Sequence, residues 1–275
     1  MFECIDFDSR FADYTTAWMK KHLKEYRNYD AMEADIPRVY LSFLNEPAPW
    51  LDGLTPGSFF SQYEDPKDLV DWLRAYCEQD VPVPEILLEQ IESVGKPCEK
   101  RLLALLQDET APMDARTTAV GVLKDMDSVL PRNLYITWQL NRGEDDELAE
   151  IALDALDEMG QAAVPQMLEA LGRANEAGQE ALLDVLVRHS RHKKLLETAL
   201  RLFETRPARR AVFAGHLARL GDEAALPALM KAANDPATGY ADFIELRAAI
   251  EALGGTPPDR DFSGDPQFEA LQKLQ

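Results

Sequence analysis

Ala152-x-x-Ala155-Leu156-x-x-Met159-Gly160-x-x-x-x-Pro165 is the stretch that decides the fold, because it recurs in outline further along the chain. The later copy reads Ala214-x-x-Leu217-x-x-Leu220-Gly221 and ends at Pro227, and Ala181-Leu182-Leu183 followed by Leu195-Leu196 stands between the two. Pro165 and Pro227 are 62 residues apart with Leu196 midway, so the step is 31 residues. A fixed period of this length is typical of stacked supersecondary units. We therefore predict an all-α protein built from consecutive helix pairs.

Each copy carries the signals of two helices joined by a short turn. Its alanines form a narrow face where helices can approach closely, and its leucines form a wider face that needs a core. The glycine suits the left-handed position after the first helix, and the proline suits the first turn of the next. One pair cannot bury both faces alone, so neighbouring pairs must stack. On this basis about five and a half pairs occupy residues 82–255, and residues 256–275 form a tail.

Residues 1–81 differ from the repeats, since they hold 15 of the 23 aromatic residues. We predict a helical cap that closes the open face of the first pair and packs on it. Helices are expected over residues 9–26 and 31–44, the second with Asp30 as N-cap and Pro37 as a kink or as its true start. Asp65-Pro66 begins another helix. Residues 47–57 form a loop rich in proline and glycine, and Trp50 is a candidate exposed anchor there.

The stretches at residues 152–165 and 214–227 resemble HEAT-like repeats of the short bacterial kind, which also occur in phycobilin-lyase-type proteins. The resemblance covers residues 82–255, and no family is recognised in residues 1–81. It implies a right-handed α–α superhelix, a solenoid of the HEAT or armadillo type. The period is shorter than the ~40 residues of eukaryotic HEAT units, and tetratricopeptide and ankyrin signatures do not occur. Such a resemblance predicts a fold and leaves the activity open.

Charge is distributed unevenly along this acidic chain. Its net charge of −20 repels phosphate backbones, so nucleic acid is not the expected partner. Between residues 188 and 219, however, nine basic residues stand against two acidic ones, which makes this segment +7 and the remainder −27. We call the segment the basic island. Its members are Arg188, Arg191, Lys193, Lys194, Arg201, Arg206, Arg209, Arg210 and Arg219.

Two interpretations of the basic island stay open at this point. In the first, Arg191, Lys193 and Lys194 line a solvated turn. Arg201, Arg209 and Arg210 then pair with carboxylates such as Asp184, Glu197 and Asp222. In the second, the island presents a cationic strip to an acidic protein segment or a phosphate-bearing ligand. The candidate partner-binding residues are Arg188, Arg191, Lys193, Lys194, Arg201, Arg206, Arg209, Arg210 and Trp50.

Motifs for catalysis or cofactor binding are missing from the sequence. It contains no G-x-G-x-x-G, G-x-x-x-x-G-K-[ST] or G-x-S-x-G, and we predict neither catalytic residues nor a cofactor. His189, His192 and His216 are expected to be surface or packing residues and not metal ligands. Three cysteines without a C-x-x-C pair indicate reduced thiols. With no signal-peptide pattern and no long apolar run, the expectation is a cytoplasmic protein without a membrane span.

The sequence favours a non-enzymatic protein-binding scaffold or adaptor that uses the groove of the solenoid. One alternative is a HEAT-like DNA glycosylase, a family that handles damaged bases with aromatic side chains and a carboxylate. That family needs a basic groove across several repeats, whereas this chain has one island. The other alternative is a bilin-lyase-like protein that binds pigment. The identity of the partner and the oligomeric state cannot be predicted from the sequence.

Overall fold

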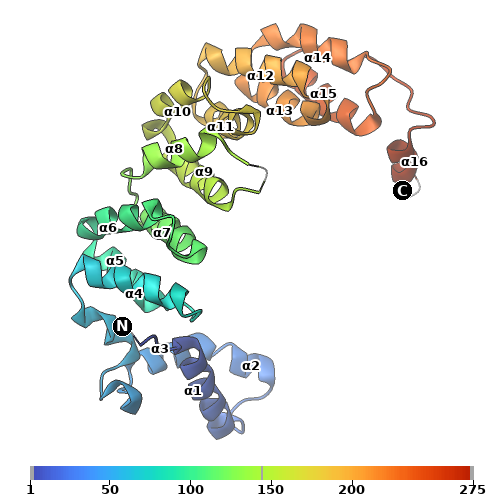
Figure 1. Cartoon of the computed structure of the whole chain (residues 1–275). Helices are drawn as coiled ribbons and strands as arrows, with labels where there is room; N and C mark the ends of the chain where they lie inside the picture. Colours follow the sequence, from blue (N-terminus) through green and yellow to red (C-terminus); the bar gives the residue numbers. More distant parts are fainter. Residues whose placement is uncertain (1–2, 144, 273–275) are drawn as a thin grey trace. The chain divides into compact units, whose positions relative to one another are not determined.

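The computed structural model describes residues 3–143 and 145–272 of the 275-residue chain, the side chains of residues 271 and 272 excepted. Residues 1–2 of the predicted cap and 273–275 of the predicted tail therefore lie outside the described part. Within that part every regular element is an α-helix or a 3-10 turn, and no β-strand occurs (Figure 1). The all-α prediction is confirmed. No helix there is both long and apolar enough to cross a lipid bilayer.

Packing divides the chain into two compact units, residues 1–131 and 132–275, which are described separately. The boundary predicted after residue 81 falls inside the first unit. The reason is that the last helix before residue 81 packs on the helices that follow it.

The first unit opens with three helices in its aromatic-rich part. They are α1 (Phe7–His22), α2 (Tyr29–Glu33) and α3 (Ile36–Asn45). The Asp6 carboxylate accepts the backbone N–H of Ser9 at 2.8 Å, so α1 begins earlier than predicted. Residues 31–44 do not form one continuous helix, and of the two alternatives predicted at Pro37 the true helix start is confirmed. Pro37 lies in the first turn of α3 and marks its start, and Asn28 caps α2 where Asp30 was expected.

Proline-rich turns and four longer helices complete the first unit. They are η1 (Pro49–Leu51), η2 (Pro56–Ser58), η3 (Phe60–Gln62), α4 (Pro66–Glu78), α5 (Glu85–Val94), α6 (Lys96–Gln107) and α7 (Met113–Asp125). Asp65 caps α4 as predicted, because its carboxylate accepts the N–H of Lys67. α4 packs on α5, α6 and α7 and buries Leu69, Leu73 and Tyr76 completely. Residues 1–81 thus pack on the first helix pair, as the sequence predicts.

The second unit holds the helices that carry the repeated stretch. Its elements are α8 (Arg132–Leu140), α9 (Glu147–Met159), η4 (Gly160–Ala162), α10 (Val164–Ala170), α11 (Glu176–His189), α12 (Lys193–Thr205), η5 (Pro207–Arg209), α13 (Arg210–Leu220), η6 (Glu223–Ala225), α14 (Leu226–Ala233), α15 (Tyr240–Ala252) and α16 (Pro266–Gln272). Consecutive repeat helices touch: α9 packs on α11, α11 on α13 and α13 on α15. The core of this unit lies along that series of contacts.

The local signals of the repeated stretch act as predicted. Gly160 and Gly221 follow α9 and α13 with φ of 51° and 73°, values that residues with a side chain rarely adopt. Gly221 takes the predicted left-handed helical conformation, whereas Gly160, with ψ of −125°, has a positive φ outside that region. Pro165 and Pro227 lie in the first turns of α10 and α14. The alanines and leucines of the stretch are buried, namely Ala152, Ala155, Leu156, Ala214 and Leu217. The repeat therefore specifies two helices, the turn between them and the buried face.

Candidate functional site

An open cavity of about 620 Å³ lies on the second unit, where the repeat helices α9, α11 and α13 come together. Its floor is apolar and includes Leu153, Ala181 and Val212. Its remaining lining is charged or polar and comes from the same helices, from η5 and from the connection between α8 and α9. These residues are Arg142, Glu150, Glu180, Asp184, Arg206, Arg209 and His216. The cavity thus combines a fixed helical frame with three guanidinium groups.

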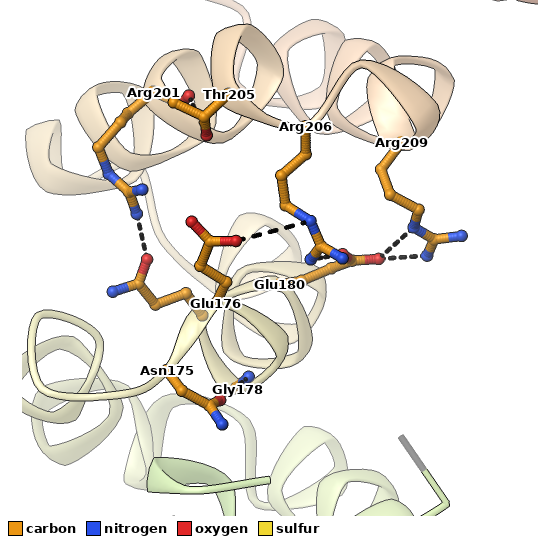
Figure 2. Close-up of polar contacts among 9 residues, drawn as sticks. Asn175, Glu176, Gly178, Glu180, Arg201, Thr205, Arg206 and Arg209 are labelled. Atoms are coloured by element: carbon orange, nitrogen blue, oxygen red, sulfur yellow. Dashed lines mark hydrogen bonds and ion pairs between the residues drawn. The ribbon is translucent and has the colours of Figure 1, made fainter. Parts of the chain in front are cut away.

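Glu180 is the centre of the polar network in this cavity. Arg206 donates from Nη1 to Glu180 Oε2 at 2.8 Å, and Arg209 donates from Nε to Oε1 at 2.8 Å and also from Nη2. Figure 2 shows both guanidiniums turned toward this carboxylate from the same side. The Glu180 side chain is 15 % exposed, against 31 % for Arg206 and 47 % for Arg209. The hydrogen bond to Glu180 raises the pKa of Arg209 further above its already high usual value.

The turn before α13 explains why the two arginines act together. Pro207 begins the 3-10 turn η5, and the N–H of Arg209 donates to the carbonyl of Arg206 at 2.9 Å. Residues three apart in such a turn are nearly eclipsed, so both side chains leave the backbone in one direction. Glu176, one turn before Glu180 on α11, is the next carboxylate, with its Oε2 3.9 Å from Arg206 Nε. One mostly buried carboxylate, that of Glu180, therefore accepts hydrogen bonds from two guanidiniums.

Arg142 forms the other wall of the cavity. Its guanidinium pairs with Glu150 and donates to Gln139 Oε1 at 3.0 Å, and only 11 % of its side chain is exposed. Gln139 is fully buried and donates from Nε2 to the carbonyl of Ala149 at 2.7 Å. The side-chain amide of Asn175 donates to the carbonyl of Arg142 at 2.9 Å. These bonds join the end of α8 to α9 and α11, which fixes the position of Arg142.

His216 is a buried polar group in the lining of this cavity. It is 7 % exposed, and its Nε2 has no hydrogen-bond partner among the described residues. Burial lowers the pKa of His216, and the neighbouring Asp184 and Glu180 oppose this effect. The imidazole is therefore neutral at pH 7. The other two histidines of the second unit make structural contacts: His189 lies 2.6 Å from Asp157, and His192 caps α12.

The rest of the basic island divides between the two interpretations. Arg188 pairs with Asp184 and Asp157, Arg201 donates to the side-chain amide of Gln179, and Arg210 lies over the Phe203 ring at 6.0 Å. Arg209 pairs with a carboxylate of the adjoining α11, as the first interpretation predicts, but this carboxylate is Glu180 and not Asp184, Glu197 or Asp222. Arg201 and Arg210 pair with no carboxylate in the described part of the chain. The remaining members have no carboxylate partner in the described part of the chain, namely Arg191, Lys193, Lys194 and Arg219.

Trp50 is not the exposed anchor that its loop suggested. It is half-buried, and its ring lies 5.7 Å from Phe7 and 6.5 Å from Phe43. The guanidinium of Arg10 lies 5.1 Å from the centre of the indole. The loop folds back on α1 and α3, so the side chain packs inward instead of projecting into solvent. Trp50 belongs to the first unit and takes no part in the cavity around Glu180.

Sequence reasoning found Arg206 and Arg209 but missed Glu180, Arg142 and His216. Among the described residues, no group of three or more histidine, cysteine, aspartate or glutamate side chains could hold a metal ion. Comparisons of the chain with protein-family models, with curated proteins and with solved structures found no match. The geometry of the cavity is therefore the main basis for a functional proposal.

Proposed function

We propose that the chain is a non-enzymatic protein-binding scaffold, and that the cavity around Glu180 binds an acidic segment of a partner protein. The observation that carries this proposal is the sharing of Glu180 by Arg206 and Arg209. Each guanidinium has five N–H groups, and Glu180 occupies one of those of Arg206 and two of those of Arg209. The other N–H groups donate no hydrogen bond to the described residues, although Arg206 Nε also lies 3.9 Å from Glu176 Oε2. They offer hydrogen bonds to further carboxylates.

The charge around the two arginines supports the same partner. Two positive charges face one mostly buried carboxylate, and Glu176 is both 3.9 Å away and 59 % exposed. Over the whole lining the three arginines are balanced by Glu150, Glu180 and Asp184, so what the cavity offers is the free N–H groups of Arg206 and Arg209 and not a net positive charge. A carboxylate-bearing segment would accept hydrogen bonds from these N–H groups, and arginine binds carboxylates in a directional, bidentate manner. A basic segment would meet the guanidiniums with repulsion.

A frame of packed helices suits binding by a preformed surface. Leu182, Val185 and Leu217 are fully buried on α11 and α13, so the backbone under the cavity is held by core packing. The fixed 31-residue step and the contacts along α9, α11, α13 and α15 support a solenoid of the HEAT type. The right-handed α–α superhelix of this proposal is what the resemblance to HEAT-like repeats implies.

A titration with a defined peptide tests the proposal. A fluorescein-labelled peptide of alternating glutamate and serine is added to the full chain, with binding followed by anisotropy at low and at physiological salt. We expect the double variant Arg206→Gln, Arg209→Gln to bind about five- to tenfold more weakly, since it loses charge-assisted hydrogen bonds at partly exposed groups. The matched control Arg191→Gln, Lys194→Gln removes the same charge outside the cavity and should change the affinity less than about twofold.

Two results would contradict this assignment. Equal losses in the two double variants would mean that general electrostatic attraction, and not the cavity, binds the peptide. Equal binding of a glutamine–serine peptide would show that the peptide needs no carboxylates to bind.

The alternative functions are tested with the same samples. Tight, salt-sensitive binding of alkylated duplex DNA would favour the glycosylase, and a shifted absorbance band on mixing with a bilin would favour the lyase.

A further inference from the structure

A second cavity, of about 390 Å³, lies in the first unit between α1, the end of α3 and the loop that follows it. Three aromatic side chains line it, Tyr14, Phe43 and Trp50, together with three prolines, Pro47, Pro49 and Pro56. It belongs to a different unit from the cavity around Glu180, and none of its lining is shared with that site. A ligand of this cavity is therefore separate from the partner proposed for the cavity around Glu180.

The wall that contains Trp50 is fixed by its backbone. The N–H of Ala48 donates to the carbonyl of Leu54 at 2.9 Å, which closes the loop on itself. Ala48, Leu51 and Pro56 are buried, and the Trp50 ring packs at 69° to Phe7 and nearly parallel to Phe43. The loop also meets α3 closely, because a Cβ on Gly57 would lie 2.9 Å from the carbonyl oxygen of Leu44. The aromatic surface is thus preformed.

Carboxylates outnumber cations on this cavity. Asp13 and Glu46 line it and are exposed, and no salt bridge in the described part of the chain joins either to a cation. Arg10 is the one basic side chain in the lining, and its guanidinium lies over the Trp50 indole. The first unit as a whole has 25 acidic and 13 basic residues, a net charge of −12. The site therefore attracts a positively charged ligand.

We propose that this cavity binds a proline-containing peptide segment in the polyproline II conformation that also carries an arginine or lysine. Proline rings fit flat aromatic and proline surfaces, and this conformation is ordered before binding at little entropic cost. Its backbone carbonyls are unbonded and can accept a hydrogen bond from the indole N–H of Trp50, which lines the cavity. The basic side chain lies against Asp13 and Glu46.

The contact between Arg10 and Trp50 limits where the basic side chain of this ligand can lie. At 5.1 Å from the ring centre, the guanidinium is within the range of a cation–π interaction. The guanidinium of the chain itself already occupies this face of the indole, so Asp13 and Glu46 are the groups left to pair with the basic side chain of the ligand. An acidic segment, by contrast, would bring its charge against Asp13 and Glu46 in a unit of net charge −12.

Fluorine NMR on the full chain labelled with 5-fluorotryptophan tests the proposal directly. The chain has four tryptophans, and the Trp50→Phe variant assigns the Trp50 resonance. Three synthetic peptides serve as probes: one with alternating prolines and a central arginine, one with glutamate in place of that arginine, and one with alanines in place of the prolines. We expect the first peptide to move the Trp50 resonance and leave that of Trp138 unchanged. The other two should bind at least about fivefold more weakly.

Two double variants separate the effect of the carboxylates on binding from that of the apolar wall. Asp13→Asn, Glu46→Gln leaves the rings and prolines in place and should remove most of the preference for the arginine peptide over the glutamate peptide. Asp52→Asn, Glu64→Gln removes the same charge from exposed positions outside the cavity lining and should keep that preference. A Trp50 resonance unmoved by millimolar arginine peptide would overturn the proposal. So would equal binding of the glutamate peptide by the unchanged chain, or an unaltered preference in the first variant.

Discussion

Gly178 on α11 packs directly on the backbone of Gln139 at the end of α8, so closely that a Cβ at Gly178 would overlap the carbonyl oxygen of Gln139. Asn175 reinforces this approach, because its backbone N–H donates to Leu140 and its side chain accepts the N–H of Gly178. The steric clash of a methyl group at this position cannot be relieved by rotating a side chain, because the atom that it meets belongs to the backbone.

Gly178→Ala should therefore destabilise the second unit by about 2–3 kcal/mol, the range for overpacking a well-packed site. Urea unfolding followed by circular dichroism measures the change. Gly215→Ala is the matched control, because its Cβ would meet nothing within 4 Å and the residue lies inside α13. That variant should stabilise the chain by about 0.5–1 kcal/mol through helix propensity. A neutral Gly178→Ala would mean that α8 and α11 are further apart than described.

Glu180→Gln should have two opposite effects. The variant loses the charge that both Arg206 and Arg209 contact, and we expect the free energy of unfolding to fall by about 1 kcal/mol, a value discounted for the exposure of the arginines. The affinity for the acidic peptide should rise severalfold, because an internal competitor for the guanidiniums is removed. Chemical denaturation and anisotropy measure the two quantities. Glu176→Gln, with its longer contact and greater exposure, should change both only slightly.

The fold could be predicted from the sequence because its signals are local. Gly160 and Gly221 end helices, Pro165 and Pro227 begin them, and the alanine and leucine faces repeat with the helical period. Helix boundaries in residues 1–81 were harder to predict, since Asp6 and Asn28 compete as caps with nearby residues of the same type. There the geometry of one hydrogen bond decides where a helix starts.

The site was only half predictable, and the reason is physical. Arg206 and Arg209 stand out as charges against an acidic background, which composition alone reveals. Glu180 is 26 and 29 residues earlier, and its role depends on how η5 directs two side chains back toward α11. From the sequence, His216 cannot be distinguished from the other residues of its helix, because its burial is apparent only in the structure. Nothing in a single sequence gives these orientations.

His216 should make the stability of the second unit depend on pH. Its pKa is lowered in the folded chain by burial, and among the groups that face it Asp184 and Glu180 oppose this while Arg219 and Arg188 add to it. The unfolded chain therefore binds the proton first, near pH 6.5, so stability present above that pH is lost as the pH falls below it. Urea midpoints between pH 7.5 and pH 5 should fall more steeply for the unchanged chain than for His216→Leu. Parallel curves would show that the imidazole titrates normally.

The last prediction concerns α4, which covers α5, α6 and α7 in the first unit. Leu69, Leu73 and Tyr76 are fully buried, and the Tyr76 hydroxyl donates to the carbonyl of Ile5 at 3.1 Å. A chain that begins at Val81 loses this cover and exposes the side chains of Leu87, Ile91 and Leu102, which are now completely buried. We expect it to bind a hydrophobic dye and to aggregate in size-exclusion chromatography. A chain that begins at Glu64 keeps α4 and should stay largely monomeric. If the chain from Val81 is monomeric and as heat-stable as the whole protein, residues 1–80 are an independent module and not a cap.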